Sequence, residues 1–241
     1  MNKNKFQSFK GICIVLHHLA YPSLWRDLVT VYGRSESSLS QIFHHMVDIV
    51  LNKVNAILYL DKNHLVPWLQ DVLNAIESAG SPIQSIVGFI DGTVQPISCP
   101  TSYQRCVYNG HKWCHAIKFQ YVVTPDGLVS HLWGPLEGQR HDITLLCMSW
   151  LEGNFEDFEG FFIYGDPAYR NSKRFCFFQP AIMDVQKEVN KRMSFIREAV
   201  EWEFCDVIKY FAFMDLKKQM KIQKTLVKNM YKLAIFFQHI S

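Results

Sequence analysis

The amino-acid sequence predicts an α/β protein in which a mixed sheet is flanked by helices, with a helical element at the N-terminus. Three observations predict this class. Apolar residues recur at helical spacing between Leu24 and Val54, short β-rich runs begin at Ser81, and helical periodicity returns from about Val185 to the C-terminus. The 241 residues, 49% of them hydrophobic, are enough for one sizeable core. We therefore expect helices, then a sheet, then helices.

Charge and cysteine content narrow the class of protein. The formal net charge of +3 is too small to identify a nucleic-acid binder, so that function must be argued from where the charges lie. The seven cysteines are an odd number without a CxxC pair, which argues against a disulfide framework and a zinc site. The apolar stretch from Gly11 to Leu16 is too short to span a bilayer. We expect a soluble protein of a reducing, intracellular compartment, with no membrane partner.

The N-terminal pattern predicts two helices separated by a glycine turn. Gly33 breaks the pattern, and Ser35 is placed to cap a second helix that runs from Glu36 to about Lys53. Helix, short turn and capped helix is the outline of a helix-turn-helix. A plain helical hairpin covering one end of the core explains the pattern equally well. The sequence therefore leaves DNA recognition by this element open.

The central region predicts a sheet. Its β-rich runs are Ile83 to Ile90, Ala116 to Val123, Leu128 to Trp133 and Phe161 to Tyr164. The turn Thr124-Pro-Asp-Gly127 joins the middle two, because proline presets the turn dihedral and glycine tolerates a positive φ. The middle two runs should form an antiparallel hairpin.

Two aspartates follow apolar runs of this sheet. Asp91 comes directly after Ile90, and Asp166 follows Tyr164 and Gly165, so each carboxylate is expected where a buried strand ends. A third acid, Glu201, falls on a predicted helix. Converging carboxylates repel one another unless cations neutralise them, and hard oxygen ligands suit Mg²⁺ or Mn²⁺. Taken singly, each aspartate could equally be a turn residue that caps a backbone amide.

Several segments carry a family resemblance. They are Gly88-Phe-Ile-Asp-Gly-Thr93, Tyr108-Asn-Gly-His-Lys112, Thr124-Pro-Asp-Gly127, Gly134-Pro-Leu-Glu-Gly138, Arg140-His-Asp142, Gly165-Asp-Pro-Ala-Tyr169 and Val200-Glu-Trp202. In this order they resemble the PIF/Harbinger-type DDE transposase family, from about Leu16 to near the C-terminus.

The resemblance implies a ribonuclease H-like fold and a nuclease that cuts DNA. In such an enzyme Asp91, Asp166 and Glu201 would be the catalytic, metal-binding acids, and the cofactor would be two Mg²⁺ or Mn²⁺ ions. Residues 1–80 would form the N-terminal helical region, and residues 81–241 the ribonuclease H-like DDE endonuclease domain.

The resemblance also implies the partners and the place of action. The partners are DNA and a separate Myb-like protein, which in such systems often supplies much of the DNA recognition. The nucleus, with the cytoplasm, is the expected location. The sequence leaves the oligomeric state open, a homo-oligomer included.

The third acid has a rival in Glu203. Two residues further along a helix is about 200° around its axis, so Glu201 and Glu203 cannot both face the cations. The family position favours Glu201. The segment between Phe178 and Asn190 is shorter than in the family, Trp113 stands where a second basic residue is expected, and Cys205 replaces a glycine. These departures leave two hypotheses: an active nuclease, or a domesticated or decayed transposase that binds DNA or a protein without cutting.

Candidate DNA contacts are found in two places. Lys112 and His141 belong to the resembling segments, although His141 could equally be hydrogen-bonded to a neighbouring loop. Near the C-terminus, lysines recur every three or four residues and would share one face of a helix: Lys217, Lys221, Lys224, Lys228 and Lys232. Lys221, Lys224 and Lys228 are the candidates there for phosphate contact. A solvated amphipathic helix explains the same spacing.

Overall fold

The structure is a computed structural model that describes residues 3–55, 58–59, 62–155, 158–166, 169, 175–177, 183–222 and 226–238. At 3–8, 62, 64, 177, 199–206 and 208 it describes the backbone alone. Its contacts divide the chain into two compact units: unit 1 is Met1–Asn55, Ile97–Pro100 and Asp206–Ser241, and unit 2 is Ala56–Pro96 and Thr101–Cys205. The domain boundary predicted near residue 80 stays a prediction.

Unit 1 is helical. Its elements are α1 (Lys3–Ala20), α2 (Trp25–Tyr32), α3 (Glu36–Val54), the 3-10 helix η1 (Ala212–Asp215) and α9 (Val227–Gln238). The two predicted N-terminal helices are confirmed as α2 and α3. Gly33 ends α2 with φ of 63°, and its N–H donates to Val29. The Ser35 hydroxyl caps α3 by accepting from the Ser38 N–H at 3.3 Å. DNA recognition by this pair of helices stays a prediction.

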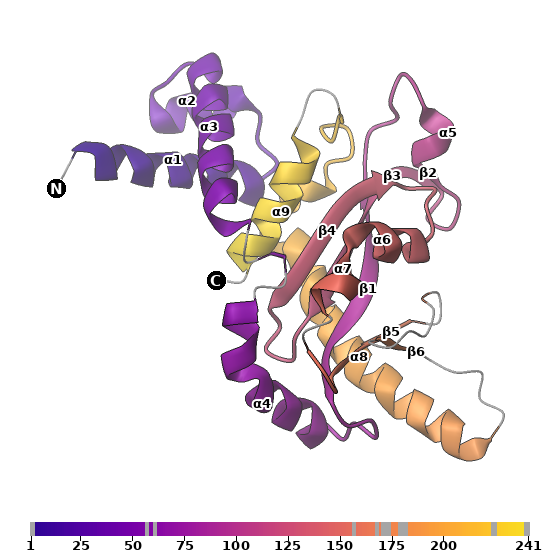
Figure 1. Cartoon of the computed structure of the whole chain (residues 1–241). Helices are drawn as coiled ribbons and strands as arrows, with labels where there is room; N and C mark the ends of the chain where they lie inside the picture. Colours follow the sequence, from indigo (N-terminus) through magenta and orange to yellow (C-terminus); the bar gives the residue numbers. More distant parts are fainter. Residues whose placement is uncertain are drawn as a thin grey trace. The chain divides into compact units, whose positions relative to one another are not determined.

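Unit 2 contains a mixed sheet (Figure 1). Its strands are β1 (Ile86–Pro96), β3 (Cys114–Val123), β4 (Val129–Glu137), β5 (Phe162–Gly165) and β6 (Phe175–Phe177), and the short β2 (Tyr108–Asn109) pairs with the start of β3. They lie in the order β4-β3-β1-β5-β6. β3 runs antiparallel to β1 and β4, whereas β5 runs parallel to β1 and to β6. The ribonuclease H-like mixed sheet is confirmed.

The predicted hairpin between β3 and β4 is confirmed as well. Gly127 has φ of 77°, and its N–H donates to the Thr124 carbonyl at 2.9 Å. The Asp126 carboxyl accepts from the Thr124 hydroxyl and the Leu128 N–H. The turn is therefore closed by the residue types that predicted it.

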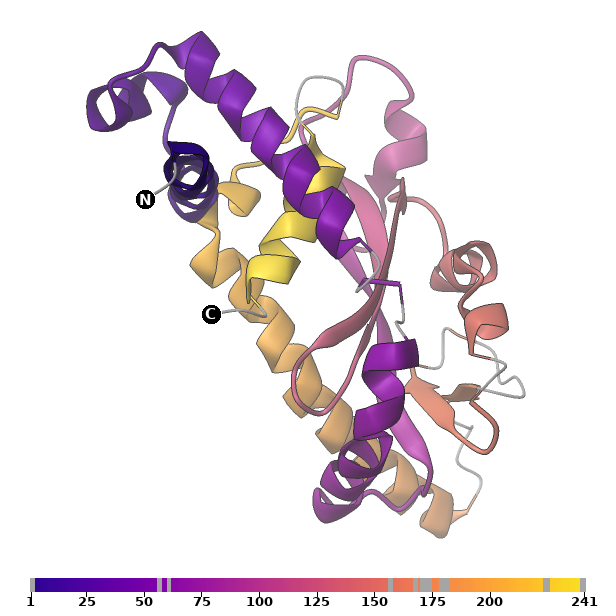
Figure 2. The same cartoon turned by 60° about the vertical axis from the view of Figure 1, so that its left-hand side comes forward.

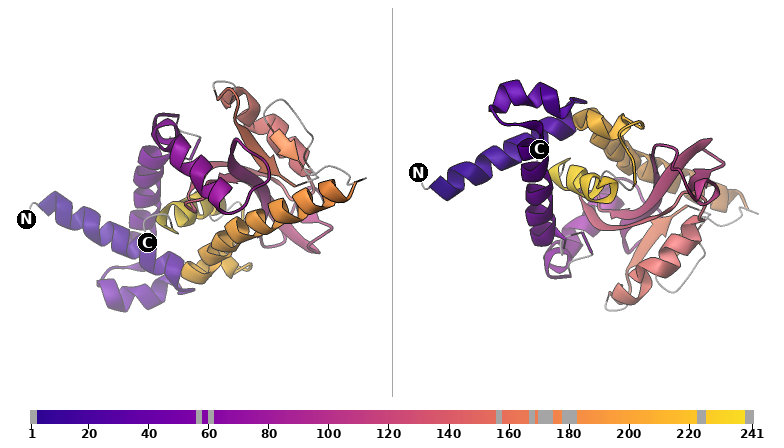
Figure 3. Two further views of the ribbon diagram at one scale, coloured as in Figure 1. Left: turned by 90° about the horizontal axis from the view of Figure 1, so that it is seen from below. Right: turned by 90° about the horizontal axis from the view of Figure 1, so that it is seen from above.

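Helices cover both faces of this sheet. They are α4 (Lys62–Ser78), the short α5 (Gln104–Val107), α6 (Asp142–Ser149), α7 (Leu151–Asn154) and α8 (Asp184–Tyr210), of which α8 belongs to unit 2 as far as Cys205. In Figure 2, α4 and α8 lie on one side of the sheet, and α6 and α7 on the other. Figure 3 shows α8 running along the sheet. One apolar cluster takes residues from α4, β1, β5, α6, α7 and α8, among them Ile76, Ile90, Leu146 and Met193.

Two expectations about strand and helix length are wrong. Asp91 lies inside β1, which continues to Pro96 because β3 pairs with it along residues 91–96. The apolar run ends at Ile90 because β1 is fully buried only up to that residue.

The prediction that the C-terminal lysines share one face of a single helix is also wrong. After η1, hydrogen-bonded turns carry Lys217, and α9 begins only at Val227. The Met220 carbonyl accepts from the Ser98 N–H, which fixes the turn region in unit 1. Lys232 is 3% exposed, with Nζ 3.5 Å from Asn55 Oδ1. The lysines therefore do not share one helix face.

Among the described helices, none is long and apolar enough to cross a membrane.

Candidate functional site

The register of two parallel strands places Asp91 and Asp166 side by side. β1 and β5 pair as far as Ile90 and Gly165, and the two aspartates are the next residue on each chain. Side chains alternate along a strand, and residues at matching positions of neighbouring strands face the same side. Both carboxyl groups are thus on the face opposite to Ile90. The strands that lead to the two acids are therefore neighbours.

Helix α8 covers the face that carries these acids. Arg197 on α8 has Nη1 3.9 Å from Asp166 Oδ2. Tyr164, two residues before Asp166 and therefore on the same face, has a pKa raised by burial and partly lowered again by the Arg197 charge. The Asp166 side chain keeps 39% of its surface exposed, and Arg197 keeps 23%. Asp166 therefore has the Arg197 guanidinium as a neighbour and is still open to solvent.

The Asp91 carboxyl is held by its own backbone. Its Oδ1 accepts the N–H of Gly92 at 2.7 Å. This contact fixes one oxygen of the carboxyl group relative to β1, the strand on which the residue lies. A strand-borne side chain held in this way has a better-defined position than one on a loop.

The opposite face of β1 carries a largely buried ion pair. Lys118 of β3 pairs in register with Val94, on the same face as Gly92. Its Nζ donates to Asp142 Oδ1 at 2.5 Å and to the Arg140 carbonyl at 3.1 Å. The Lys118 side chain is 9% exposed and that of Asp142 28%. Asp142 begins α6, so this pair fastens the start of α6 to the sheet.

Gly92 lets this pair approach the acid site. A Cβ at Gly92 would lie 2.7 Å from Asp142 Oδ1, closer than side-chain carbons come, and 3.6 Å from the Tyr169 hydroxyl. Any larger residue would therefore push Asp142 away from β1. Since Gly92 follows Asp91, the Lys118–Asp142 pair lies directly behind the backbone that carries the Asp91 carboxyl.

Tyr169 lies between the two faces. Burial raises its pKa well above the ordinary value, the charges of Asp142, Asp91 and Asp166 raise it further, and Arg197 opposes them. The side chain is 3% exposed. The phenol hence stays protonated at neutral pH, within the field of all three carboxylates.

The third predicted acid, Glu201, lies in α8, but its side chain is outside the described part of the chain, as is that of Glu203. Among the described residues, no three His, Cys, Asp or Glu side chains form a group that could hold a metal ion. Asp91 and Asp166 do supply the hard carboxylate oxygens that Mg²⁺ and Mn²⁺ prefer. The chemistry of these two donors fits such an ion.

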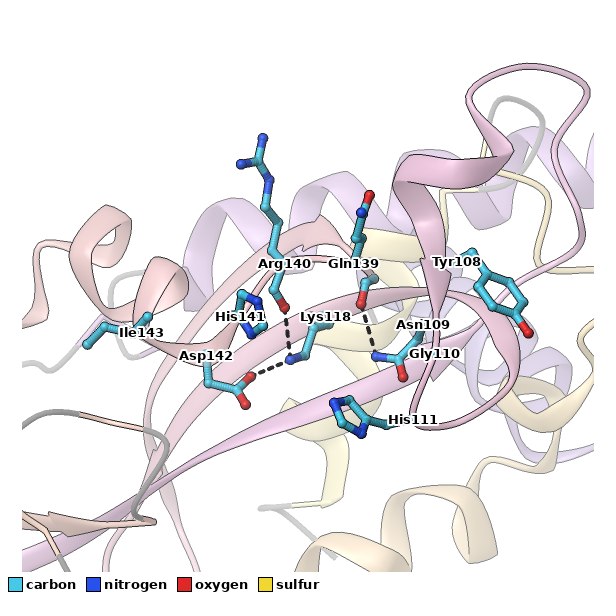
Figure 4. A pocket seen from close by; sticks show the side chains of 11 residues that line it. Tyr108, Asn109, Gly110, His111, Lys118, Gln139, Arg140, His141, Asp142 and Ile143 are labelled. Atoms are coloured by element: carbon cyan, nitrogen blue, oxygen red, sulfur yellow. Dashed lines mark hydrogen bonds and ion pairs between the residues drawn. The ribbon is translucent and has the colours of Figure 1, made fainter.

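The predicted DNA contacts are distributed over both units. In unit 2, Lys112 is exposed in the turn after β2, and exposed His141 precedes α6 and lines a cavity of about 600 Å³ together with Lys118 and Asp142 (Figure 4). In unit 1, Lys221 and Lys228 are exposed, and Lys224 lies outside the described residues.

Sequence reasoning missed the roles of Lys118, Arg197 and Tyr169. A lysine within the apolar run Ala116 to Val123 was a usable signal, because a buried ammonium needs a partner. Arg197 stands four residues before Glu201, which is the spacing of one helix face. No signal in the sequence marked Tyr169 as a buried phenol affected by the charges of Asp142, Asp91 and Asp166.

Comparison with known proteins adds one match. A family model described as DDE superfamily endonuclease matches residues 90–237, more than half of the chain, and this stretch begins one residue before Asp91. Searches among curated proteins and among solved structures gave no match.

Proposed function

Because the chain belongs to the DDE superfamily endonuclease family, we propose that it is a divalent-metal-dependent DNA endonuclease. Asp91, Asp166 and Glu201 are its catalytic acids and hold two Mg²⁺ or Mn²⁺ ions. Within the family, the motif order supports placing it with the PIF/Harbinger-type transposases.

The observation that carries the proposal is the placement of Asp91 and Asp166. They follow the last register pair of two adjacent parallel strands and face the same side. Two carboxylates so placed repel each other, and the Arg197 guanidinium, 3.9 Å from Asp166, offsets some of that repulsion. A site of this kind attracts cations.

Helix α8 supplies the reason to choose Glu201 over Glu203. Position 201 follows Arg197 by four residues and is about 40° from it around the helix axis, whereas position 203 is about 120° from it. Arg197 contacts Asp166, so the face of α8 that carries position 201 is the face that covers the acids. The spacing and the family motif favour the same residue.

The chain's own groups would prepare this site for phosphodiester cleavage. Two divalent cations, when bound by such carboxylates, activate the attacking water and stabilise the departing oxygen. Gly92 fixes one oxygen of Asp91, and protonated Tyr169 can donate a hydrogen bond to a neighbouring carboxylate. Lys118 neutralises Asp142, so that this third aspartate does not add an uncompensated charge behind β1.

DNA would be held by Lys112 and His141 in unit 2 and by Lys221, Lys224 and Lys228 in unit 1. Exposed lysines bind phosphates with little sequence preference, and a Myb-like partner protein in the nucleus would add recognition. Replacing Lys221, Lys224 and Lys228 with glutamine should weaken binding to all sequences alike and flatten its salt dependence. An unchanged salt slope would remove these lysines from the DNA contact.

The direct experiment is a nicking assay. Purified protein is incubated with supercoiled DNA and Mn²⁺, with and without EDTA, beside the Asp91→Asn variant. We expect nicking that EDTA and the substitution both abolish. Nicking that persists in Asp91→Asn would come from a contaminant or another site, and a parent that never nicks would refute the activity.

A second candidate function is DNA binding without cleavage. The observation that favours it is the Arg197 guanidinium, because it supplies a positive charge to Asp166 without any metal ion. A direct titration with Mn²⁺, followed by electron paramagnetic resonance, separates the two functions. Binding of Mn²⁺ that is lost in Asp91→Asn supports the nuclease, whereas DNA binding by a parent that takes up no Mn²⁺ supports the second candidate.

A further inference from the structure

Residues 101–113 hold two large aromatic side chains out into solvent. Tyr103 and Trp113 are each 82% exposed. Both have a left-handed backbone, with φ of 57° and 52°, which bulky L-residues rarely adopt. Exposed aromatic surface and an unfavourable backbone are both costly, and such costs gather where a ligand is bound. In Figure 1 this segment contains α5 and β2, at one end of the sheet.

The segment is anchored, so the two rings are presented by fixed backbone. The Asn109 side chain donates to the Gly138 carbonyl at 2.9 Å and accepts from the Lys112 N–H at 2.9 Å. The Cys106 carbonyl accepts from the Gln139 N–H at 3.2 Å. These bonds join both halves of the segment to the loop between β4 and α6.

The charge of the region suits a polyanion. No acidic residue occurs in the sequence from Gly92 to Pro125. Within residues 101–113, Arg105 and Lys112 are exposed, and neither forms an ion pair among the described residues. Arg140 stands across the cavity of Figure 4 from this segment.

We propose that residues 101–113 bind an unpaired DNA strand, with Tyr103 and Trp113 stacking on its bases and Arg105 and Lys112 contacting its phosphates. Aromatic rings interleaved with cations are the means by which proteins hold single strands, since every base has a face on which a ring can stack. In a duplex those faces are covered by neighbouring bases. The inference rests on the proposed function in that DNA is the ligand.

The cavity beside the segment lies on the α6 face of β1, opposite to the face of the proposed acids. Tyr108 and His111 line one side of its roughly 600 Å³, and Arg140 and Asp142 line the other (Figure 4). This volume lies in the range of small-ligand sites and has room for one nucleotide. Asp142 also reaches the backbone of Gly92, next to Asp91. A strand held by residues 101–113 would therefore run along the α6 side of β1, behind the backbone that carries Asp91.

The test measures binding in EDTA, so that it does not depend on cleavage. Fluorescence anisotropy of a labelled oligothymidylate and of a labelled duplex is recorded for the parent and for Tyr103→Ala and Trp113→Ala. We expect each substitution to weaken single-strand binding roughly tenfold or more, while duplex binding changes little. Trp113→Phe, which keeps a ring, should restore most of the affinity. Circular dichroism checks that each variant is folded.

Trp150→Ala is the matched control. Trp150 is also 78% exposed with φ of 55°, but acids follow it in the sequence, beginning with Glu152. Its removal should leave single-strand binding unchanged. The proposal is overturned if the parent does not bind the oligothymidylate, if Trp113→Ala binds it as the parent does, or if single strand and duplex lose affinity equally. Single-strand binding by a parent that never nicks would refute the nuclease and leave this inference standing.

Discussion

The two faces of strand β1 treat their charged groups in opposite ways. On the α6 face, Lys118 and Asp142 form a short, largely buried ion pair, with Lys118 side-chain exposure of 9%. On the α8 face, Asp166 is 39% exposed and meets Arg197 only at 3.9 Å. The two charges of the first face pair with each other. The second brings two carboxylates together where Asp166 is open to solvent, an arrangement that favours binding of a cation.

The largest expected effect tests the proposed acids on the α8 face. Asp91→Asn, Asp166→Asn and Glu201→Gln should each lower nicking by about 10³-fold or more, and the triple variant should be little worse, because the acids act as one unit. Circular dichroism and DNA binding should stay close to those of the parent. Glu203→Gln is the control and should retain activity. Should Glu203→Gln be inactive while Glu201→Gln cuts, the third acid has been assigned to the wrong residue.

The next effect tests the Lys118–Asp142 ion pair on the α6 face. Lys118→Met or Asp142→Leu alone leaves one charge of a desolvated pair without its partner, which costs about 3–5 kcal/mol of unfolding free energy. Replacing both residues removes both charges, so the double variant should be nearly as stable as the parent. Urea unfolding of the parent, the two single variants and the double variant measures this coupling. Additive losses would mean that the two charges do not stabilise each other.

Much of the fold followed from the sequence because local chemistry decides it. Gly33 and Ser35 mark the boundary of two helices wherever those helices lie, and Thr124-Pro-Asp-Gly127 makes a turn from its own dihedral preferences. The placement of Asp91 beside Asp166 was also within reach, because the two apolar runs are alike and strands of that kind tend to be neighbours.

What the sequence could not give depends on partners far along the chain. The length of β1 beyond Ile90 is set by pairing with β3, and the partner of Lys118 is 24 residues away, on α6. The turns after η1 are fixed in part by Ser98, more than a hundred residues earlier. The helical spacing of the lysines therefore predicted a single helix that does not form. The spacing of residues along the sequence predicts a helix or strand in isolation. It does not show which distant contacts end that helix or strand.

A third way of burying a titratable group occurs in unit 1. His18 stacks on Trp25 with ring centroids 3.9 Å apart, and its Nδ1 has no hydrogen-bond partner in the described part of the chain. Burial, with the nearby His44 and His17, lowers its pKa to about 4. This side chain is buried uncharged, unlike the charges on either face of β1.

Acid should therefore destabilise unit 1 in a defined window. Above the ordinary histidine pKa of 6.5, His18 is neutral in both states. Between 6.5 and about 4 only the unfolded chain takes up the proton, so stability falls as the pH falls, by roughly 3 kcal/mol in all, and this loss ends near pH 4. Urea unfolding across this range measures the slope. His18→Phe should flatten it, and an unchanged slope would assign the effect to other groups.

The smallest effect on stability, and the one that decides between the two proposed functions, concerns Arg197. Its pair with Asp166 is long and part-exposed, so Arg197→Met should cost less than about 1 kcal/mol of unfolding free energy, far less than either Lys118 or Asp142 alone. Arg192→Met, which breaks an exposed pair with Glu188, is the matched control on the same helix.

The same Arg197→Met variant should gain affinity for Mn²⁺. The guanidinium repels a divalent cation at Asp166, and removing it lowers that repulsion, although solvent screening keeps the gain to roughly a few-fold. Arg192→Met should leave Mn²⁺ binding as it is in the parent. In the nuclease, the parent binds Mn²⁺ and Arg197→Met binds it somewhat more tightly. In a protein that binds DNA without cutting, the parent takes up no Mn²⁺ and only the variant does. If Arg197→Met instead weakens Mn²⁺ binding, the arginine orients Asp166 for the cation, and its charge does not oppose metal binding on the α8 face.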